Sequence, residues 1–138
     1  MAKEFKYQIT TPELPRETLI EDIDNLIKIF KKKNISSLKI MFGYAWAVFS
    51  NDWKEITIDI NSLQGEIQKA EQAGHGELGD DDLYIYFDNL EIRYCHHGDI
   101  HLRYSDRDDL IDEIIESWID KNWTLRSTDK EQDLGFVE

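Results

Sequence analysis

The sequence predicts an α+β fold, a two-layer sandwich in which one antiparallel sheet of five strands is covered on one face by helices. Apolar residues alternate with polar ones in five segments, which is the pattern of strands with one buried face. In three other segments they recur every three to four residues, as in amphipathic helices. The predicted order is helix, two strands, helix, three strands, helix. Because each element has a single apolar face, two layers are enough to bury them all.

Residues 82–104 predict a three-stranded meander whose register follows from its turns. Asp88 and Asn89 fit a two-residue turn, because both residue types tolerate a left-handed backbone. Gly98 fits the last position of a three-residue turn for the same reason. With these turns, large residues face one another across the strands on the inner face: Leu83 with Tyr94, Ile85 with Ile92, Phe87 with Leu90, Tyr94 with Ile100, and Ile92 with Leu102.

The other elements follow from the same periodicities and from helix-capping signals. Residues 1–123 are expected to form one domain, and the polar residues 124–138 are expected to form a frayed tail. The expected elements are a short edge strand at 5–9, a helix entered through 11–15 that runs to about Lys33, a hairpin over 37–60, a helix over 62–73, and a helix capped by Ser105 that ends at Asn122.

The charge of the chain is unevenly distributed. The net charge of the 138 residues is -13. Residues 1–69 contain ten basic and ten acidic side chains, whereas residues 70–138 contain six and nineteen. Direct nucleic-acid binding is not expected, because phosphate binding needs clustered Lys and Arg. An acidic field instead favours a basic protein partner, and solubility is the alternative explanation for it.

The sequence also predicts where the protein works. No apolar run is long enough to cross a membrane, and the first residues lack the apolar core of a signal peptide. A single cysteine, Cys95, excludes an internal disulfide framework. We therefore expect a cytoplasmic protein without a membrane partner.

The segment from Cys95 to His101 contains the residue types that bind transition metals. The predicted hairpin argues against such a site, because it puts His96 and His97 in the turn and pairs His101 with Arg93. A Cys95–His96 dyad is not expected either, since adjacent side chains on a strand point to opposite faces. Nucleotide-binding loops and hydrolase motifs are absent from the sequence. No catalytic residue, metal or cofactor is therefore predicted, and the chain is not expected to be an enzyme.

The outer face of the predicted sheet is the candidate interface. Tyrosine and arginine gather there, and both are enriched at binding hot spots, although an ordinary solvated face is the alternative. The last helix adds carboxylates that point away from its apolar stripe. The candidate partner-binding residues are Tyr84, Tyr86, Glu91, Arg93, His101 and Arg103 on the sheet, and Asp109, Asp112 and Glu116 on the helix.

These observations favour an acidic binding module that neutralises a basic partner. Most concretely, we expect an immunity protein against a toxin nuclease, because nuclease active sites are basic and attract an acidic inhibitor. In size, acidity and lack of catalytic motifs the chain resembles such immunity proteins in general. Two alternatives are a small metal-binding protein or enzyme that uses the His96–His101 turn, and an acidic adaptor or subunit of a complex.

Overall fold

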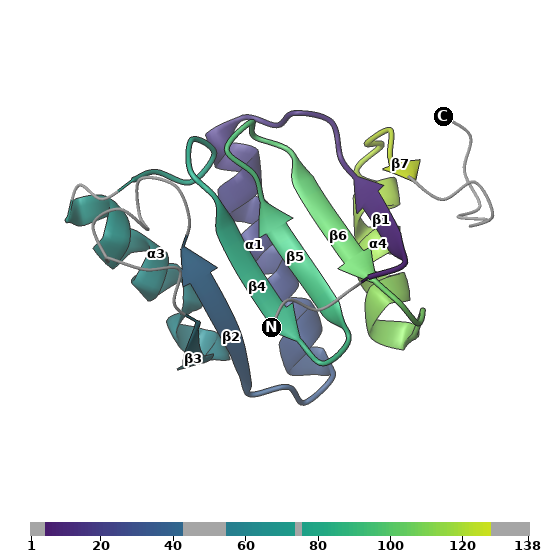
Figure 1. Ribbon diagram of the computed structural model, residues 1–138, viewed down its shortest axis with the longest axis horizontal. Coiled ribbons are helices and arrows are strands. Elements are labelled where there is room, and N and C mark those ends of the chain that lie inside the picture. The colour runs from purple at the N-terminus through teal and green to yellow at the C-terminus, as the bar shows by residue number, and fades with distance from the viewer. Residues whose placement is uncertain (1–4, 43–54, 74–75, 128–138) are drawn as a thin grey trace.

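The computed structural model describes residues 5–42, 55–73 and 76–127, which form one antiparallel sheet with helices packed on it (Figure 1). The elements are, in chain order, β1 (Tyr7–Thr10), α1 (Arg16–Lys32), β2 (Ser37–Phe42), β3 (Ile56–Asp59), the short 3-10 helix η1 (Ile60–Ser62), α3 (Leu63–Gln72), β4 (Leu83–Phe87), β5 (Leu90–Tyr94), β6 (Ile100–Tyr104), α4 (Asp109–Asp120) and β7 (Arg126–Ser127). Figure 1 shows α1 and α4 behind the strands, so the opposite face of the sheet points toward the viewer.

The predicted fold class is confirmed, but the predicted number of strands is wrong. The sheet has seven strands in the order β3-β2-β4-β5-β6-β1-β7. The two additional strands are β1, with four residues, and β7, with two. β1 lies between β6 and β7, so it is not the edge strand that the sequence suggested. β1 overlaps the short strand expected at 5–9, whereas β7 has too few residues to show alternation in the sequence.

The predicted register of the meander is confirmed in every inner pair. Asp88 has a φ of 52° and Gly98 has a φ of 88°, so both turns use the left-handed backbone that their residue types permit. The same register puts Glu91 opposite Arg103 and Arg93 opposite His101 on the outer face.

Two predicted boundaries need correction. The N-cap of α4 is Asp108 rather than Ser105, because the Asp108 carboxylate accepts a hydrogen bond from the Ile111 amide at 2.9 Å. The expected tail begins inside the fold, since Leu125 is fully buried and Arg126–Ser127 pair with β1. Residues 128–138 lie outside the described residues, as do 43–54 in the predicted hairpin.

The core lies between the sheet and the helices and contains one fully enclosed carboxylate. Asp22 of α1 accepts hydrogen bonds from the Tyr94 hydroxyl and from Nε1 of Trp118, each at 2.8 Å. The Lys121 ammonium lies 3.4 Å from the same carboxylate. Burial raises the pKa of Asp22, and these donors offset part of that effect. The cluster joins α1, β5 and α4 at one point.

Candidate functional site

The outer face of the sheet aligns the six predicted sheet residues in two neighbouring cross-strand rows. One row contains Tyr86, Glu91 and Arg103, and the next contains Tyr84, Arg93 and His101. The first row runs Thr57, Lys39, Tyr86, Glu91, Arg103, Gln8, and the second runs Met41, Tyr84, Arg93, His101, Thr10. The predicted sheet residues therefore share one surface.

Side chains within these rows hold one another in place. The rings of Tyr84 and Tyr86 stack with centroids 6.2 Å apart, and the Arg93 guanidinium lies 5.4 Å from the Tyr84 ring centroid. Arg103 contacts the Glu91 carboxylate at 3.4 Å. Burial and the neighbouring Glu91 carboxylate raise the pKa of Tyr86, so its hydroxyl keeps its proton at physiological pH.

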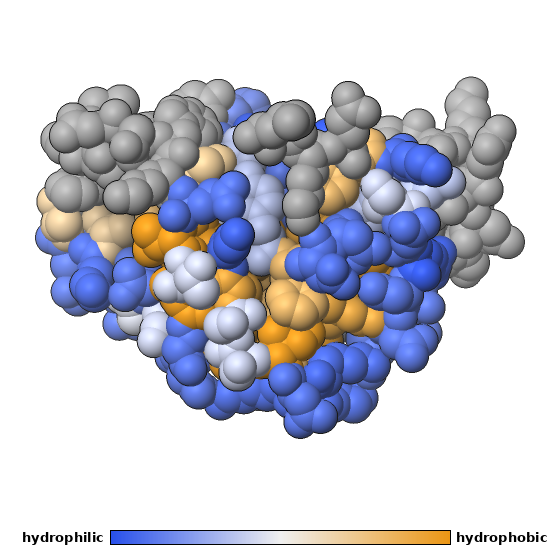
Figure 2. Space-filling view, turned by 60° about the horizontal axis from the view of Figure 1, so that its bottom comes forward, coloured by the Kyte–Doolittle hydropathy of each residue, from blue (hydrophilic) through white to orange (hydrophobic). Residues whose placement is uncertain are grey.

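A hollow of about 740 Å³ opens at one end of the first row. Its lining combines the ring of Tyr86 with acidic, basic and hydroxyl groups, whereas the side chains of Leu38 and Phe87 pack on the core side of the sheet. Its lining residues are Ser37, Leu38, Lys39, Glu55, Thr57, Tyr86, Phe87, Asp88, Glu91 and Arg103. Figure 2, which brings the lower edge of Figure 1 forward, shows apolar surface bordered by hydrophilic residues where the β4–β5 turn and the start of β2 lie. Such mixed surfaces bind large side chains of a partner.

The helical candidates lie apart from this surface, because α4 packs on the opposite face of the sheet (Figure 1). Asp109 and Glu116 are exposed, and Asp112 pairs with Arg107. Glu113 on the same helix lies 2.9 Å from Lys32 and 3.6 Å from Lys33, and its hydrogen bond with Lys32 lowers its pKa. The nine candidate residues therefore form two surfaces rather than one.

Directly after β5, the chain brings Cys95 and His96 into contact, contrary to the sequence-based expectation. The Cys95 sulfur lies 3.7 Å from Nδ1 of His96. Strand alternation ends at Tyr94, and a tight turn follows in which the Gly98 amide donates to the Cys95 carbonyl at 2.9 Å. The rule that adjacent side chains diverge therefore does not apply at this position.

Asp82 completes this contact and also argues against a catalytic role for the cysteine. Its fully buried carboxylate accepts from the His96 amide at 2.8 Å and lies 3.0 Å from His96 Nδ1 and 3.1 Å from Arg93. Asp82 and Cys95 thus contact the same ring nitrogen, whereas a catalytic triad uses the two nitrogens separately. Burial raises the pKa of Cys95, which keeps it a thiol. The geometry does not provide an activated nucleophile.

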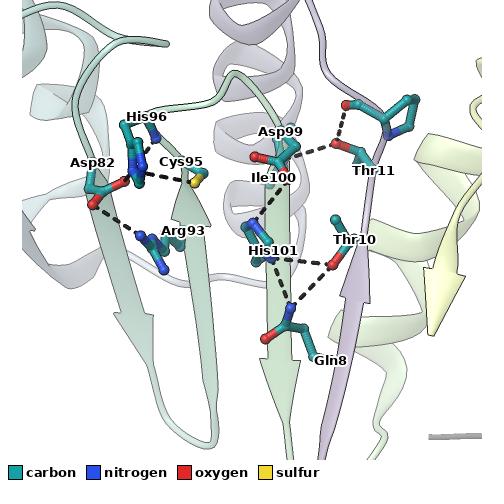
Figure 3. A network of polar contacts seen from close by, with 11 residues as sticks. Gln8, Thr10, Thr11, Asp82, Arg93, Cys95, His96, Asp99, Ile100 and His101 are labelled. Atoms are coloured by element: carbon teal, nitrogen blue, oxygen red, sulfur yellow. Dashed lines mark hydrogen bonds and ion pairs between the residues drawn. The ribbon is translucent and has the colours of Figure 1, made fainter. Parts of the chain in front are cut away.

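A second polar group flanks Cys95 on β6. Nε2 of His101 lies 3.1 Å from the Asp99 carboxylate, and its Nδ1 lies 2.9 Å from the Gln8 amide nitrogen and 3.2 Å from the Thr10 hydroxyl. Burial lowers the pKa of His101, so its ring is neutral at physiological pH. Figure 3 shows Cys95 between the Asp82–His96 contact and the Asp99–His101 contact.

Sequence reasoning missed Asp82 as a member of this cluster, whereas Asp99 lies within the segment from Cys95 to His101 that was considered as a metal site. Asp82 had a usable signal, because it precedes β4 in phase with the outward Tyr84. Its proximity to Cys95 depends on the turn conformation, which periodicity does not describe.

Comparison with protein-family models, with curated protein sequences and with solved structures finds no match to this chain. Among the described helices, none is long and apolar enough to cross a membrane. The two surfaces and the Cys95 cluster are the features of the described residues that bear on function.

Proposed function

We propose that the chain is an acidic protein-binding module that inhibits a basic partner, most concretely an immunity protein that blocks a toxin nuclease. The outer face of the sheet is the proposed contact surface. The acidic α4, in the opposite layer, contributes a long-range field that raises the rate of encounter with a basic protein.

The hollow on the outer face is the observation that carries this proposal. It places the Glu55 carboxylate, and the largely buried Glu91 carboxylate, near the ring of Tyr86. A lysine or arginine side chain of a partner would lay its aliphatic stem on the Tyr86 ring and its cation against these carboxylates. Arg103 already contacts Glu91, at the long distance of 3.4 Å, so a partner guanidinium would compete with a weak internal contact.

Affinity capture tests the proposal. The immobilised chain is exposed to source-cell lysate at low salt, eluted at high salt, and the eluate is assayed for nuclease activity. We expect a basic protein whose nuclease activity is suppressed when an equimolar amount of the chain is added back. A captured nuclease that stays fully active in the presence of the chain would refute the inhibitor function.

Two variants with the same change in charge localise the contact. Glu55→Gln removes one carboxylate from the hollow, whereas Glu13→Gln removes one from an exposed loop away from it. We expect only the first variant to shorten the lifetime of the complex. Equal effects of the two variants would show that net charge, rather than the hollow, accounts for binding.

A further inference from the structure

Several side chains at or beside the turn between β5 and β6 carry atoms that can bind a metal ion. The ligand atoms of Cys95, Asp99 and His101 all lie within 4.8 Å of one another. Those of Asp82, Cys95 and His96 do so as well, so the sulfur of Cys95 belongs to both sets. Thiolate, imidazole and carboxylate are the three side-chain groups that bind zinc in proteins.

The two sets differ in how far their oxygen atoms are already used. Asp82 accepts from the His96 amide, lies near His96 Nδ1 and pairs with Arg93. A cation in that set would have to break these contacts. By contrast, Oδ1 of Asp99 is buried and has no hydrogen-bond partner within the described part of the chain. A buried acceptor without a donor is costly, and a cation would remove that cost.

We propose that Cys95, Asp99 and His101 form a zinc-binding site at the β5–β6 turn. Zinc bonds of about 2.0–2.3 Å in a tetrahedral arrangement place ligand atoms about 3.3–3.7 Å apart. The 3.1 Å between His101 Nε2 and Asp99 Oδ2 is close to this spacing, and the 4.8 Å limit on the whole set leaves only a small side-chain adjustment. A water molecule takes the fourth position.

The contacts of His101 can orient it as a metal ligand after one change of partner. Without metal, the Gln8 amide nitrogen donates to Nδ1 at 2.9 Å, so the ring proton lies on Nε2 and faces Asp99. Zinc takes the place of that proton if Gln8 turns its amide oxygen toward Nδ1, which then carries the ring proton beside the Thr10 hydroxyl. Nε2 is then left with its lone pair toward Asp99 and Cys95. Such outer partners fix the orientation and tautomer of zinc-bound histidines.

The positive charge of Arg93 does not prevent zinc binding at this site, because a nearby carboxylate balances it. Arg93 pairs with Asp82 at 3.1 Å, and these two charges cancel. Zinc binding replaces the thiol proton of Cys95, which leaves to solvent, and the resulting thiolate and the Asp99 carboxylate together neutralise the ion. The site with its surroundings is then electrically neutral, as a largely buried site requires.

Titration of the chelator-treated chain with zinc chloride and with cobalt(II) tests this site. We expect one zinc ion per chain by calorimetry, a higher melting temperature with zinc, and a near-ultraviolet sulfur-to-cobalt absorption band. The cobalt band reports on Cys95 in the unaltered chain, so it does not depend on any variant folding correctly. Absence of the band, or no saturable binding of zinc, would overturn the proposal.

Single substitutions identify the ligands. Cys95→Ser should abolish the cobalt band, and Asp99→Asn and His101→Gln should each weaken zinc binding at least about tenfold, with Thr10→Val giving about a tenfold loss through His101. The exposed His97 in the same turn provides the matched control, and His97→Gln should leave zinc affinity unchanged. If His96→Gln abolishes binding while His101→Gln does not, the ion lies in the Asp82 set and the assignment is wrong.

Discussion

Two carboxylates on opposite sides of the sheet, Asp22 and Asp82, are almost completely buried but have different neighbours. Asp22, on the helix-covered side, is 2% exposed and is surrounded by the Tyr94 hydroxyl, the Trp118 indole and the Lys121 ammonium. Asp82, on the outer side, is 0% exposed and contacts Arg93 and His96 beside a cysteine. The first carboxylate has two aromatic donors, and the second lies within a group of potential metal ligands.

This difference indicates that the helix-covered side mainly stabilises the fold, whereas the outer side carries the groups that can bind a partner or a metal ion. The donors to Asp22 come from residues far apart in the chain, with separations of 72 positions for Tyr94 and 96 for Trp118. Their hydrogen bonds therefore join elements that local structure cannot bring together. The outer face has the opposite character, because its polar side chains are neighbours across strands and many remain partly exposed. We expect substitutions behind the sheet to change folding and substitutions on the outer face to change binding.

The largest expected effect is that of Asp22→Ala on stability. The variant leaves the Tyr94 hydroxyl and Trp118 Nε1 buried without their acceptor, and each such group costs about 1–3 kcal/mol. Relief from the desolvation of the carboxylate offsets part of this, so we expect a net loss of about 2–4 kcal/mol in the free energy of unfolding, measured by urea denaturation. Asp24→Ala, an exposed site on the same helix, is the control and should stay within about 0.5 kcal/mol. A loss of the same size at both sites would refute the special role of Asp22.

The pH dependence of the free energy of unfolding also tests the role of Asp22. Burial raises the pKa of Asp22 in the folded chain, so the folded state keeps this proton at pH values where the unfolded state, with a pKa of about 3.9, has lost it. The stability contributed by the protonated carboxyl is therefore lost as the pH rises from about 4 to the pKa of Asp22 in the folded chain. The total loss in the free energy of unfolding is about 1.4 kcal/mol for each pH unit between the unfolded and the folded pKa. Asp22→Asn removes this titration and leaves the other carboxylates in place. The stability of the unaltered chain relative to Asp22→Asn should fall through this window, and a relative rise would show that the donors outweigh burial.

The sequence was sufficient for the sheet register and the outer face, because both depend on local patterns. Alternation in β4, β5 and β6 and the turn residues Asp88 and Gly98 determine which side chains face outward. β1 was expected, but at the edge of the sheet, and β7 was not expected, because strands of four and two residues show little or no alternation. Their positions in the sheet come from tertiary packing, as the buried Leu125 beside β7 illustrates.

The candidate sites were predictable only in part, for a similar reason. Tyr84, Tyr86 and the residues paired with them followed from register. The contact of Cys95 with His96 and Asp82 did not, because it begins where the strand ends and depends on a turn closed by backbone hydrogen bonds. The separation of α4 from the outer face, by contrast, followed from the predicted two-layer sandwich, in which the helices cover only one face of the sheet.

On the outer face we expect Tyr86→Ala to affect binding more than folding. The side chain is partly exposed, and its ring stacks on Tyr84 at the rim of the hollow. Removing it should weaken binding of the basic partner by about 1 kcal/mol or more, measured by calorimetry, while urea denaturation changes little. Tyr86→Phe keeps the ring and serves as the control for the hydroxyl. A large loss of stability in Tyr86→Ala would mean that this face contributes to the core, which would break the contrast between the two faces.

The smallest expected effect concerns α4, whose carboxylates lie in the layer opposite the outer face. Asp109→Asn, Asp112→Asn and Glu116→Gln together keep the shape of the helix and remove three negative charges. Exposed charges act through a field that extends about 30 Å at 0.01 M salt but only about 8 Å at physiological ionic strength. The triple variant should therefore associate several-fold more slowly with the basic partner at low salt, with a smaller change at high salt, as measured by stopped-flow mixing. The dissociation rate should change little, because these residues do not touch a partner that binds the outer face. If the dissociation rate changes most, α4 lies inside the interface, and the partner binds the helical layer rather than the sheet.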